Sequence, residues 1–134
     1  MSQENVELVR SIYAPWERGD FSPAGWEHPE IEITIVGGPG TSTSTGRAAA
    51  AKTLREFLDA WERVRFAADE YRELDGERVL VLDRAGGRGK TSALDLGEIH
   101  ANGAHLFHVG GGQVTRVIRY WDRDRALADL GLAE

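Results

Sequence analysis

The second half of this sequence is a series of alternating apolar segments separated by short turn sequences, and this feature constrains the fold most. The segments with strand-like alternation are Arg65 to Leu74, Arg78 to Ala85, Thr91 to Val109 and Gln113 to Trp121. The turn or break sequences are Asp75-Gly76, Gly86-Gly87, Asn102-Gly103 and Gly110-Gly111-Gly112. Strands joined by such short turns run antiparallel. The sequence therefore predicts an antiparallel sheet over most of its second half.

Two long helices and one strand are expected in the first half. Apolar residues recur every three or four positions from Glu4 to Trp16 and again from Ala48 to Glu62, which is the pattern of a helix with one apolar face. Pro15 is expected to kink or end the first helix because it lacks a backbone N–H. Period-two alternation from Ile31 to Val36 predicts a strand. The TSTST stretch at 41–45 is interpreted as a polar loop.

Two shorter helical segments complete the expected secondary structure. Phe21 to Trp26 is expected to form a short helical turn before His28-Pro29 imposes an extended conformation. Asp122 is a candidate cap for a final helix that packs Ala126, Leu127 and Leu130 inward and ends at Gly131.

Composition and charge exclude several classes of function. The 134 residues, 41% of them apolar, fit one domain, 1–134, with no apolar run long enough to span a membrane. The formal charge of -6 opposes nucleic-acid binding. The absence of cysteine excludes disulfides and thiolate metal sites. The N-terminus lacks the features of a secretory signal, so a cytoplasmic location is expected.

The order of these elements predicts an α+β fold. The first half is expected to alternate helices with a strand, and the second half to form consecutive antiparallel strands. In such an arrangement the helices segregate to one face of a mixed, mainly antiparallel sheet. A curved sheet of this kind, with helices over its concave face, encloses a pocket.

The chain resembles the nuclear transport factor 2-like superfamily, and within it the SnoaL-like, polyketide cyclase-like branch. The resemblance rests on RSIYAPWERGDF, HPEIEI, TGRAAAAKTLREFLDAWE and YWDRDRAL, and it extends over essentially the whole chain. It implies a cone-shaped α+β roll that commonly forms a homodimer through the outer sheet face. The superfamily includes cyclases, isomerases, hydrolases and dehydratases, so the resemblance does not identify the chemistry.

The closing hairpin determines which side chains enter the pocket. When the turn of the cyclases is aligned on Gly110-Gly111-Gly112-Gln113, Gly110 pairs with Val114. His105 then lies opposite Arg119 on the pocket face. Leu106, Val114, Ile118 and Tyr120 are expected to form an outward apolar patch that supports a homodimer.

The resemblance also shows where this chain departs from its relatives. The cyclases have an aspartate, their general base, at the position of Arg119, and a guanidinium has no lone pair with which to accept a proton. The epoxide hydrolase pattern also needs an aspartate there. The ketosteroid isomerase base is absent from the strand around Ile33 to Gly37, and the histidines and tyrosines of scytalone dehydratase are matched only loosely by His105, His100 and Tyr13.

These considerations predict a pocket in which an arginine lies beside a histidine. The candidate catalytic residues are His105 as acid or base, Arg119 polarising an oxygen, and Tyr13 assisting. The candidate ligand-binding residues are Trp16, Phe57, Trp61, Phe107, Val117 and Trp121. The expected ligand is a small, partly apolar organic molecule that bears an acid or carbonyl group.

Several alternatives remain open. If catalytic, the protein is expected to be a lyase, isomerase or hydrolase that needs no cofactor. A non-catalytic ligand-sensing or dimeric interaction module is the competing interpretation. Arg119 could instead pair with Glu98, Asp83 or Asp122. No metal is expected at His100, His105 and His108, because the last two point to opposite faces of a strand. The stretch from Gly86 to Lys90 is interpreted as a hairpin turn.

Overall fold

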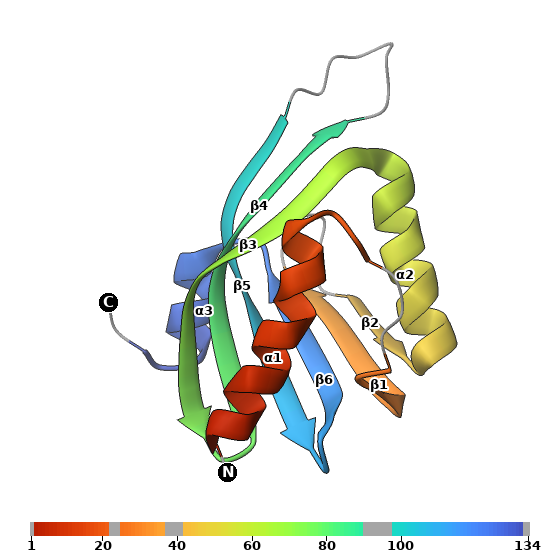
Figure 1. Ribbon diagram of the computed structural model, residues 1–134. Coiled ribbons are helices and arrows are strands. Elements are labelled where there is room, and N and C mark those ends of the chain that lie inside the picture. The colour runs from red at the N-terminus through yellow and green to blue at the C-terminus, as the bar shows by residue number, and fades with distance from the viewer. Residues whose placement is uncertain (1, 22–24, 37–41, 90–97, 133–134) are drawn as a thin grey trace.

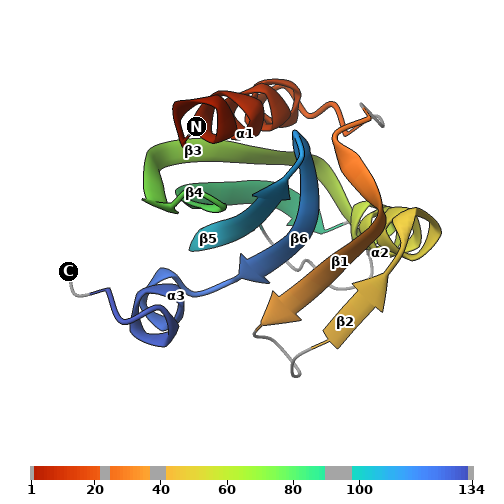
Figure 2. The same cartoon turned by 90° about the horizontal axis from the view of Figure 1, so that it is seen from below.

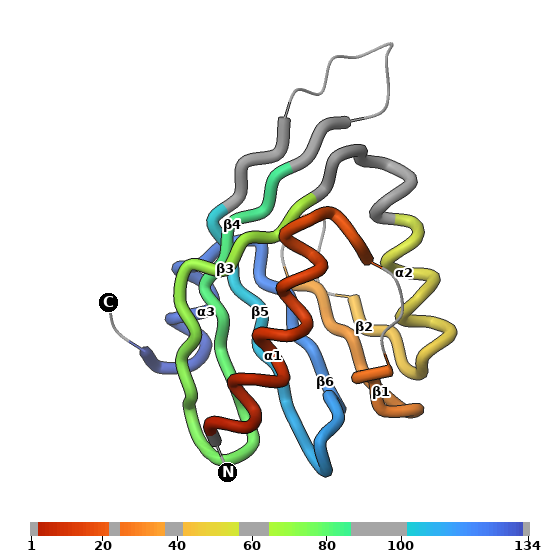
Figure 3. The backbone as a smooth tube through the Cα atoms, viewed as in Figure 1, coloured from red at the N-terminus to blue at the C-terminus, as the bar shows by residue number. Residues whose placement is uncertain are grey.

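The structure, a computed structural model, describes residues 2–21, 25–36, 42–89 and 98–132 (Figures 1 and 3). For residues 2, 57–64, 87–89 and 98–101 it describes the backbone alone. The elements in chain order are α1 (Ser2–Glu17), β1 (Glu27–Val36), β2 (Ser42–Thr45), α2 (Arg47–Ala60), β3 (Trp61–Asp75), β4 (Arg78–Gly89), β5 (Glu98–Gly110), β6 (Gln113–Tyr120) and α3 (Arg123–Asp129).

The strands form a six-stranded sheet in the order β2-β1-β6-β5-β4-β3. Only the β1 and β6 pair is parallel among the described strands; the other neighbours are antiparallel. Seen from below, the sheet is strongly curved, with α1 against one face and α3 against the other (Figure 2). The predicted α+β fold with a curved, mixed, mainly antiparallel sheet is confirmed.

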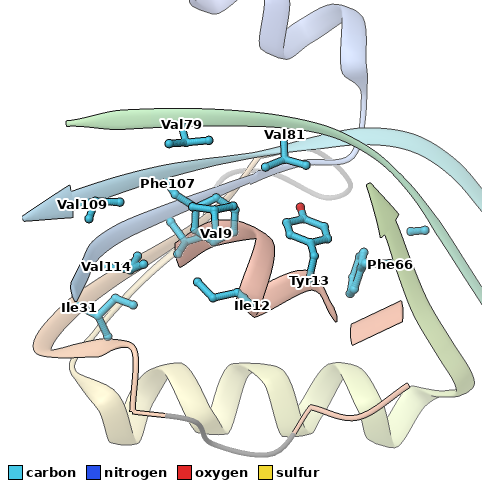
Figure 4. Packing of buried hydrophobic residues seen from close by; sticks show 12 residues of the cluster. Val9, Ile12, Tyr13, Ile31, Phe66, Val79, Val81, Phe107, Val109 and Val114 are labelled. Carbon is cyan, nitrogen blue, oxygen red and sulfur yellow. The ribbon is translucent and has the colours of Figure 1, made fainter. Parts of the chain in front are cut away.

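Helix α1 contributes the centre of the inner core. Val9, Ile12 and Tyr13 recur at helical spacing and are at most 1% exposed, and they point towards the strands (Figure 4). Complete burial of an aliphatic side chain of this size stabilises the fold by about 1.5–3 kcal/mol. The helix ends within one turn of Pro15, where Gly19 adopts a positive φ of 79°. This matches the expected end.

The outer face of the sheet is covered by α3, so the expectation that the helices segregate to one face was wrong for this helix. Leu106, Ile118 and Tyr120 pack there with Ala126 and Leu127, and all five are at most 9% exposed. Asp122 caps α3 as expected, accepting a hydrogen bond from the backbone N–H of Asp124. The predicted outward patch is thus largely covered within the chain. The homodimer stays a prediction.

The β5–β6 hairpin corrects the expected turn but preserves the expected register at the site. Gly110 pairs with Gln113 instead of Val114, because Gly111 and Gly112 form a two-residue turn with φ values of 61° and 79°. A bulge near His108 restores the register, so His105 lies opposite Arg119.

The same bulge changes the face to which one residue points. Val114, predicted on the outer face, is fully buried in the inner core. The reason is that a shift of one position turns a side chain to the other face of a strand.

Three other expectations about the strands were wrong. Residues 42–45, expected in a loop, form the edge strand β2, which pairs with β1 through its backbone and needs no apolar alternation. Strand β4 continues through Gly86 and Gly87 to Gly89, because Gly86 pairs with both β3 and β5, Gly87 with β5 and Gly89 with β3. Strand β5 continues through Asn102 and Gly103 without a break.

The boundaries of α2 also differ from the prediction. Trp61 and Glu62, expected at the end of this helix, begin β3 and pair with Gly89 and Arg88. Residues 22–24, within the expected short helical turn, and 91–97, within the expected third strand of the series, lie outside the described residues.

Candidate functional site

A cavity of about 350 Å³ is lined by residues of α1, α2 and the inner face of the sheet. Its wall is mostly apolar. The aromatic lining residues are Trp16, Phe21, Trp26, Phe66 and Trp121, and the aliphatic ones include Ile31, Ile33, Ile35, Leu54 and Val117. The polar lining residues are His105 and Arg119 of the central strands, Glu27 of β1, and Thr53 and Arg55 of α2. Such a combination of apolar wall and few polar groups is typical of small-molecule sites.

The structure brings together part of the predicted site. Trp16, His105, Val117, Arg119 and Trp121 all line the cavity. Tyr13 and Phe107 are fully buried in the core and do not line it. The side chains of the other two predicted lining residues, Phe57 and Trp61, lie outside the described residues.

The centre of the site is the carboxylate of Asp83, which is completely buried on β4. The Tyr13 hydroxyl lies 2.6 Å from its Oδ2, and Nδ1 of His105 lies 2.7 Å from the same oxygen. Nη1 of Arg119 donates to Oδ1 at 2.7 Å. Asp83 was expected only as one possible partner of Arg119, and not as a site residue. It is the carboxylate that pairs with Arg119.

Strand alternation could have placed Asp83 in the site. Val79 and Val81 are buried in the inner core, and Asp83 is the next residue on the same face of β4. Its cross-strand partner Gly103 and the nearby His105 belong to β5. The alternation of Asp83 with two buried valines is the feature of the sequence that predicts an inward-pointing carboxylate.

Arg119 is held between aromatic rings and has an unsatisfied edge. Its guanidinium carbon lies 5.0 Å from the centre of the Phe66 ring and 4.4 Å from that of Trp121, in the range of cation–π contacts. Its Nε and Nη2 atoms are buried and have no hydrogen-bond partner among the described residues. Buried donors are nearly always paired in folded proteins. Arg119 lines the cavity, so an acceptor on a ligand that reached this edge would satisfy it.

Three groups contact Nδ1 of His105: Oδ2 of Asp83 at 2.7 Å, the Tyr13 hydroxyl at 2.8 Å and Nη1 of Arg119 at 3.2 Å. We assign the proton to Nδ1, because a lone pair there would be repelled by the carboxylate at the shortest of these distances. Tyr13 then donates to the same carboxylate. In a neutral imidazole, Nε2 is then the acceptor.

Burial and the nearby Arg119 charge lower the pKa of His105, although Asp83 opposes this shift. Burial also acts to raise the pKa of Asp83, but its interactions with His105, Arg119 and Tyr13 outweigh burial and hold that pKa well below the ordinary value. Burial, followed by Asp83, raises the pKa of Tyr13 well above its usual value. At neutral pH the site thus contains one positive arginine, one negative aspartate, a neutral histidine and a neutral tyrosine.

No group of three metal-ligating side chains gathers anywhere among the residues that the structure describes. In the same part of the chain, no helix combines the length and apolar character needed to cross a membrane.

Comparisons with known proteins identify the fold. No protein-family model and no curated protein matches the sequence. Solved structures do match: a protein described as a SnoaL-like polyketide cyclase from Jannaschia sp. CCS1 has 16% identity and a TM-score of 0.71, over 88% of this chain and 85% of its own. An NTF2-like protein of unknown function from Burkholderia pseudomallei K96243 has 20% identity and a TM-score of 0.74, over 93% and 95%.

A third similar structure is TerC co-crystallised with polyporic acid, with 23% identity and a TM-score of 0.71 over 95% of this chain and 97% of its own. Likeness at these identities defines the fold and leaves the chemistry open. The chain has the fold of these SnoaL-like and NTF2-like structures, so the predicted resemblance is confirmed at the level of the fold.

Proposed function

We propose that this protein binds a small, partly apolar organic molecule in the cavity and holds an acidic or carbonyl oxygen of that molecule at Arg119. The observation that carries the proposal is the buried edge of the guanidinium, where Nε and Nη2 lack partners among the described residues. An unpaired buried donor of a charged group is unfavourable. An acceptor oxygen on a ligand removes this penalty.

The cavity supports the apolar part of the proposal. Its volume of about 350 Å³ is near the lower end of the range for small-molecule sites, about 300–1,000 Å³. Aromatic side chains of α1, β3 and the end of β6 line it beside the polar pair. The proposed ligand is a compact molecule with a flat or aliphatic body and one oxygen directed towards β6.

A conservative substitution tests the proposal. Arg119→Lys keeps the positive charge beside Asp83 but removes the parallel Nε and Nη2 donors. Thermal-shift screening against small acids, lactones and ketones is expected to identify stabilising compounds for the wild type and to show at least a tenfold weaker response in the variant. Arg116→Lys, at an exposed position of the same strand, is the matched control. Equal responses in Arg119→Lys and wild type would reject Arg119 as the ligand contact.

Catalysis is a second candidate function, favoured by the pairing of Asp83 with His105. A neutral imidazole with Nδ1 bound to a carboxylate offers Nε2 as a general base. Arg119 would polarise a substrate carbonyl, so that His105 removes a proton from the adjacent carbon. Tyr13 does not line the cavity and would act by positioning His105 and Asp83. Of the predicted classes, this proton abstraction belongs to a lyase or an isomerase that needs no cofactor.

Deuterium exchange separates the catalytic proposal from binding alone. A ketone that stabilises the protein is incubated with it in deuterated buffer, and NMR follows the protons next to the carbonyl. Catalysis predicts exchange above the buffer rate, lost in His105→Gln and retained in His108→Gln. Binding without accelerated exchange supports the non-catalytic ligand-sensing module instead.

A further inference from the structure

We infer that Asp83 is the residue that sets the charge of the ligand, so that the cavity accepts a neutral carbonyl oxygen in preference to a carboxylate. This inference rests on the proposed function and narrows it. It concerns a residue that does not line the cavity and that acts through Arg119 and His105. Asp83 is therefore a specificity-determining and positioning residue.

Asp83 and Arg119 balance each other's charge inside the protein. Asp83 is 0% exposed and Arg119 is 4% exposed, and Nη1 of Arg119 lies 2.7 Å from Oδ1 of Asp83. Each charge therefore has its counter-ion inside the protein. His105 and Tyr13 add no charge at neutral pH. Glu27 and Arg55 also line the cavity and carry opposite formal charges, so the lining together with Asp83 has no net formal charge before a ligand arrives.

The charge of the ligand changes this balance. A carbonyl oxygen accepts hydrogen bonds from Nε and Nη2 and leaves the cluster neutral. A carboxylate at the same edge brings a second negative charge to a guanidinium that Asp83 already neutralises, in an apolar wall where uncompensated charge is strongly disfavoured. The guanidinium supplies the hydrogen bonds in both cases, but the net charge favours the neutral ligand.

Asp83 also orients His105. Oδ2 of Asp83 accepts from both the Tyr13 hydroxyl and Nδ1 of His105. With the proton assigned to Nδ1, Nε2 of His105 keeps its lone pair. The lone pair on Nε2 repels an approaching anion but does not carry a charge that disfavours a neutral ketone. Both actions of Asp83 thus favour the same class of ligand.

Two probes with the same naphthalene body test the inference. They are 2-acetylnaphthalene and 2-naphthoate, which have the same number of non-hydrogen atoms and differ in the charge at the oxygen end. Calorimetric titration at pH 7.5 is expected to show at least tenfold tighter binding of the ketone by the wild type. Asp83→Asn leaves the arginine charge uncompensated. It is expected to shift the ratio of the two dissociation constants at least tenfold in favour of the carboxylate. Asp129→Asn, an equal change of charge in an exposed ion pair on α3, is expected to keep the wild-type ratio.

The outcomes distinguish this inference from the proposed function. Equal or tighter binding of the carboxylate by the wild type overturns the role of Asp83 but agrees with the proposed function. This comparison uses the wild type alone and does not require Asp83→Asn to fold. Nitrogen-15 NMR of the wild type provides a second check, because a proton on Nε2 of His105 instead of Nδ1 would also overturn it. If neither probe binds the wild type or the variant, the proposed function fails and the inference falls with it.

Discussion

The guanidinium of Arg119 lies directly over Gly103, in the middle of β5. A Cβ added to Gly103 would lie 2.9 Å from Nη2 and 3.1 Å from Cζ of Arg119. It would also lie inside contact distance of the Tyr120 carbonyl oxygen. Glycine inside a strand often marks the close approach of another group. Here it gives the arginine room to reach Asp83 on the next strand.

Gly103→Ala is therefore expected to destabilise the fold and to displace Arg119 from Asp83. Overpacking of a buried position costs typically about 1–3 kcal/mol. Denaturant unfolding measures this loss. Gly110→Ala, at the end of the same strand, places its Cβ no closer than 3.6 Å to Thr115 and serves as the control. A loss of stability in Gly103→Ala no larger than in the control would contradict the close approach.

Removal of the Asp83 carboxylate is expected to be strongly destabilising. Asp83→Ala leaves the Arg119 charge, the Tyr13 hydroxyl and the His105 N–H without their shared acceptor. Breaking a buried ion pair by removing one partner costs about 3–5 kcal/mol. Asp129→Ala, in an exposed pair with Arg125, is expected to change the free energy of unfolding by about 0.5 kcal/mol or less. Similar effects of both substitutions would show that Asp83 does not organise the site.

Stability is expected to fall as the pH is lowered from neutrality. The pKa of His105 is lower in the folded protein than its ordinary 6.5, so below that pH the unfolded chain takes up a proton that the folded chain does not, and the free energy of unfolding decreases. The lowered pKa of Asp83 acts in the same direction below its ordinary 3.8. Denaturant unfolding between pH 7 and 3 measures the slope.

His105→Gln provides the matched comparison for this pH dependence. The variant is expected to lose part of the slope between pH 7 and pH 5. The remaining slope includes His108, because burial, followed by Arg116 and Arg78, also lowers the pKa of that residue. A wild-type stability that rises towards pH 5 would contradict the direction of both histidine shifts.

The sequence predicted the face of the sheet to which His105 and Arg119 point, although the turn used for that prediction was wrong. Strand alternation is a local property, and the bulge after His108 compensated for the shorter turn. Val114 lies between the turn and the bulge, where the register is not compensated, and the face predicted for its side chain was therefore wrong. Bulges depend on pairing with a neighbouring strand, so the alternation of one strand does not reveal them.

The missing site residue and the missing strand have different physical causes. Asp83 follows two inward valines in strict alternation, but its burial requires Arg119 and His105 from other strands. A buried carboxylate can be predicted only together with its partners. The strand at Ser42–Thr45 forms because its backbone pairs with the free edge of β1. Its residues are polar, so the sequence has no apolar alternation there to predict a strand. Both depend on contacts distant in sequence.

The most direct test of the central claim is an NMR titration that observes the arginine Nε–H groups during ligand binding. The account predicts that 2-acetylnaphthalene moves the Nε–H resonance of Arg119 to a hydrogen-bonded position at saturation, while that of exposed Arg116 on the same strand stays unchanged. Saturable binding of the ketone with no change at Arg119 would contradict the account.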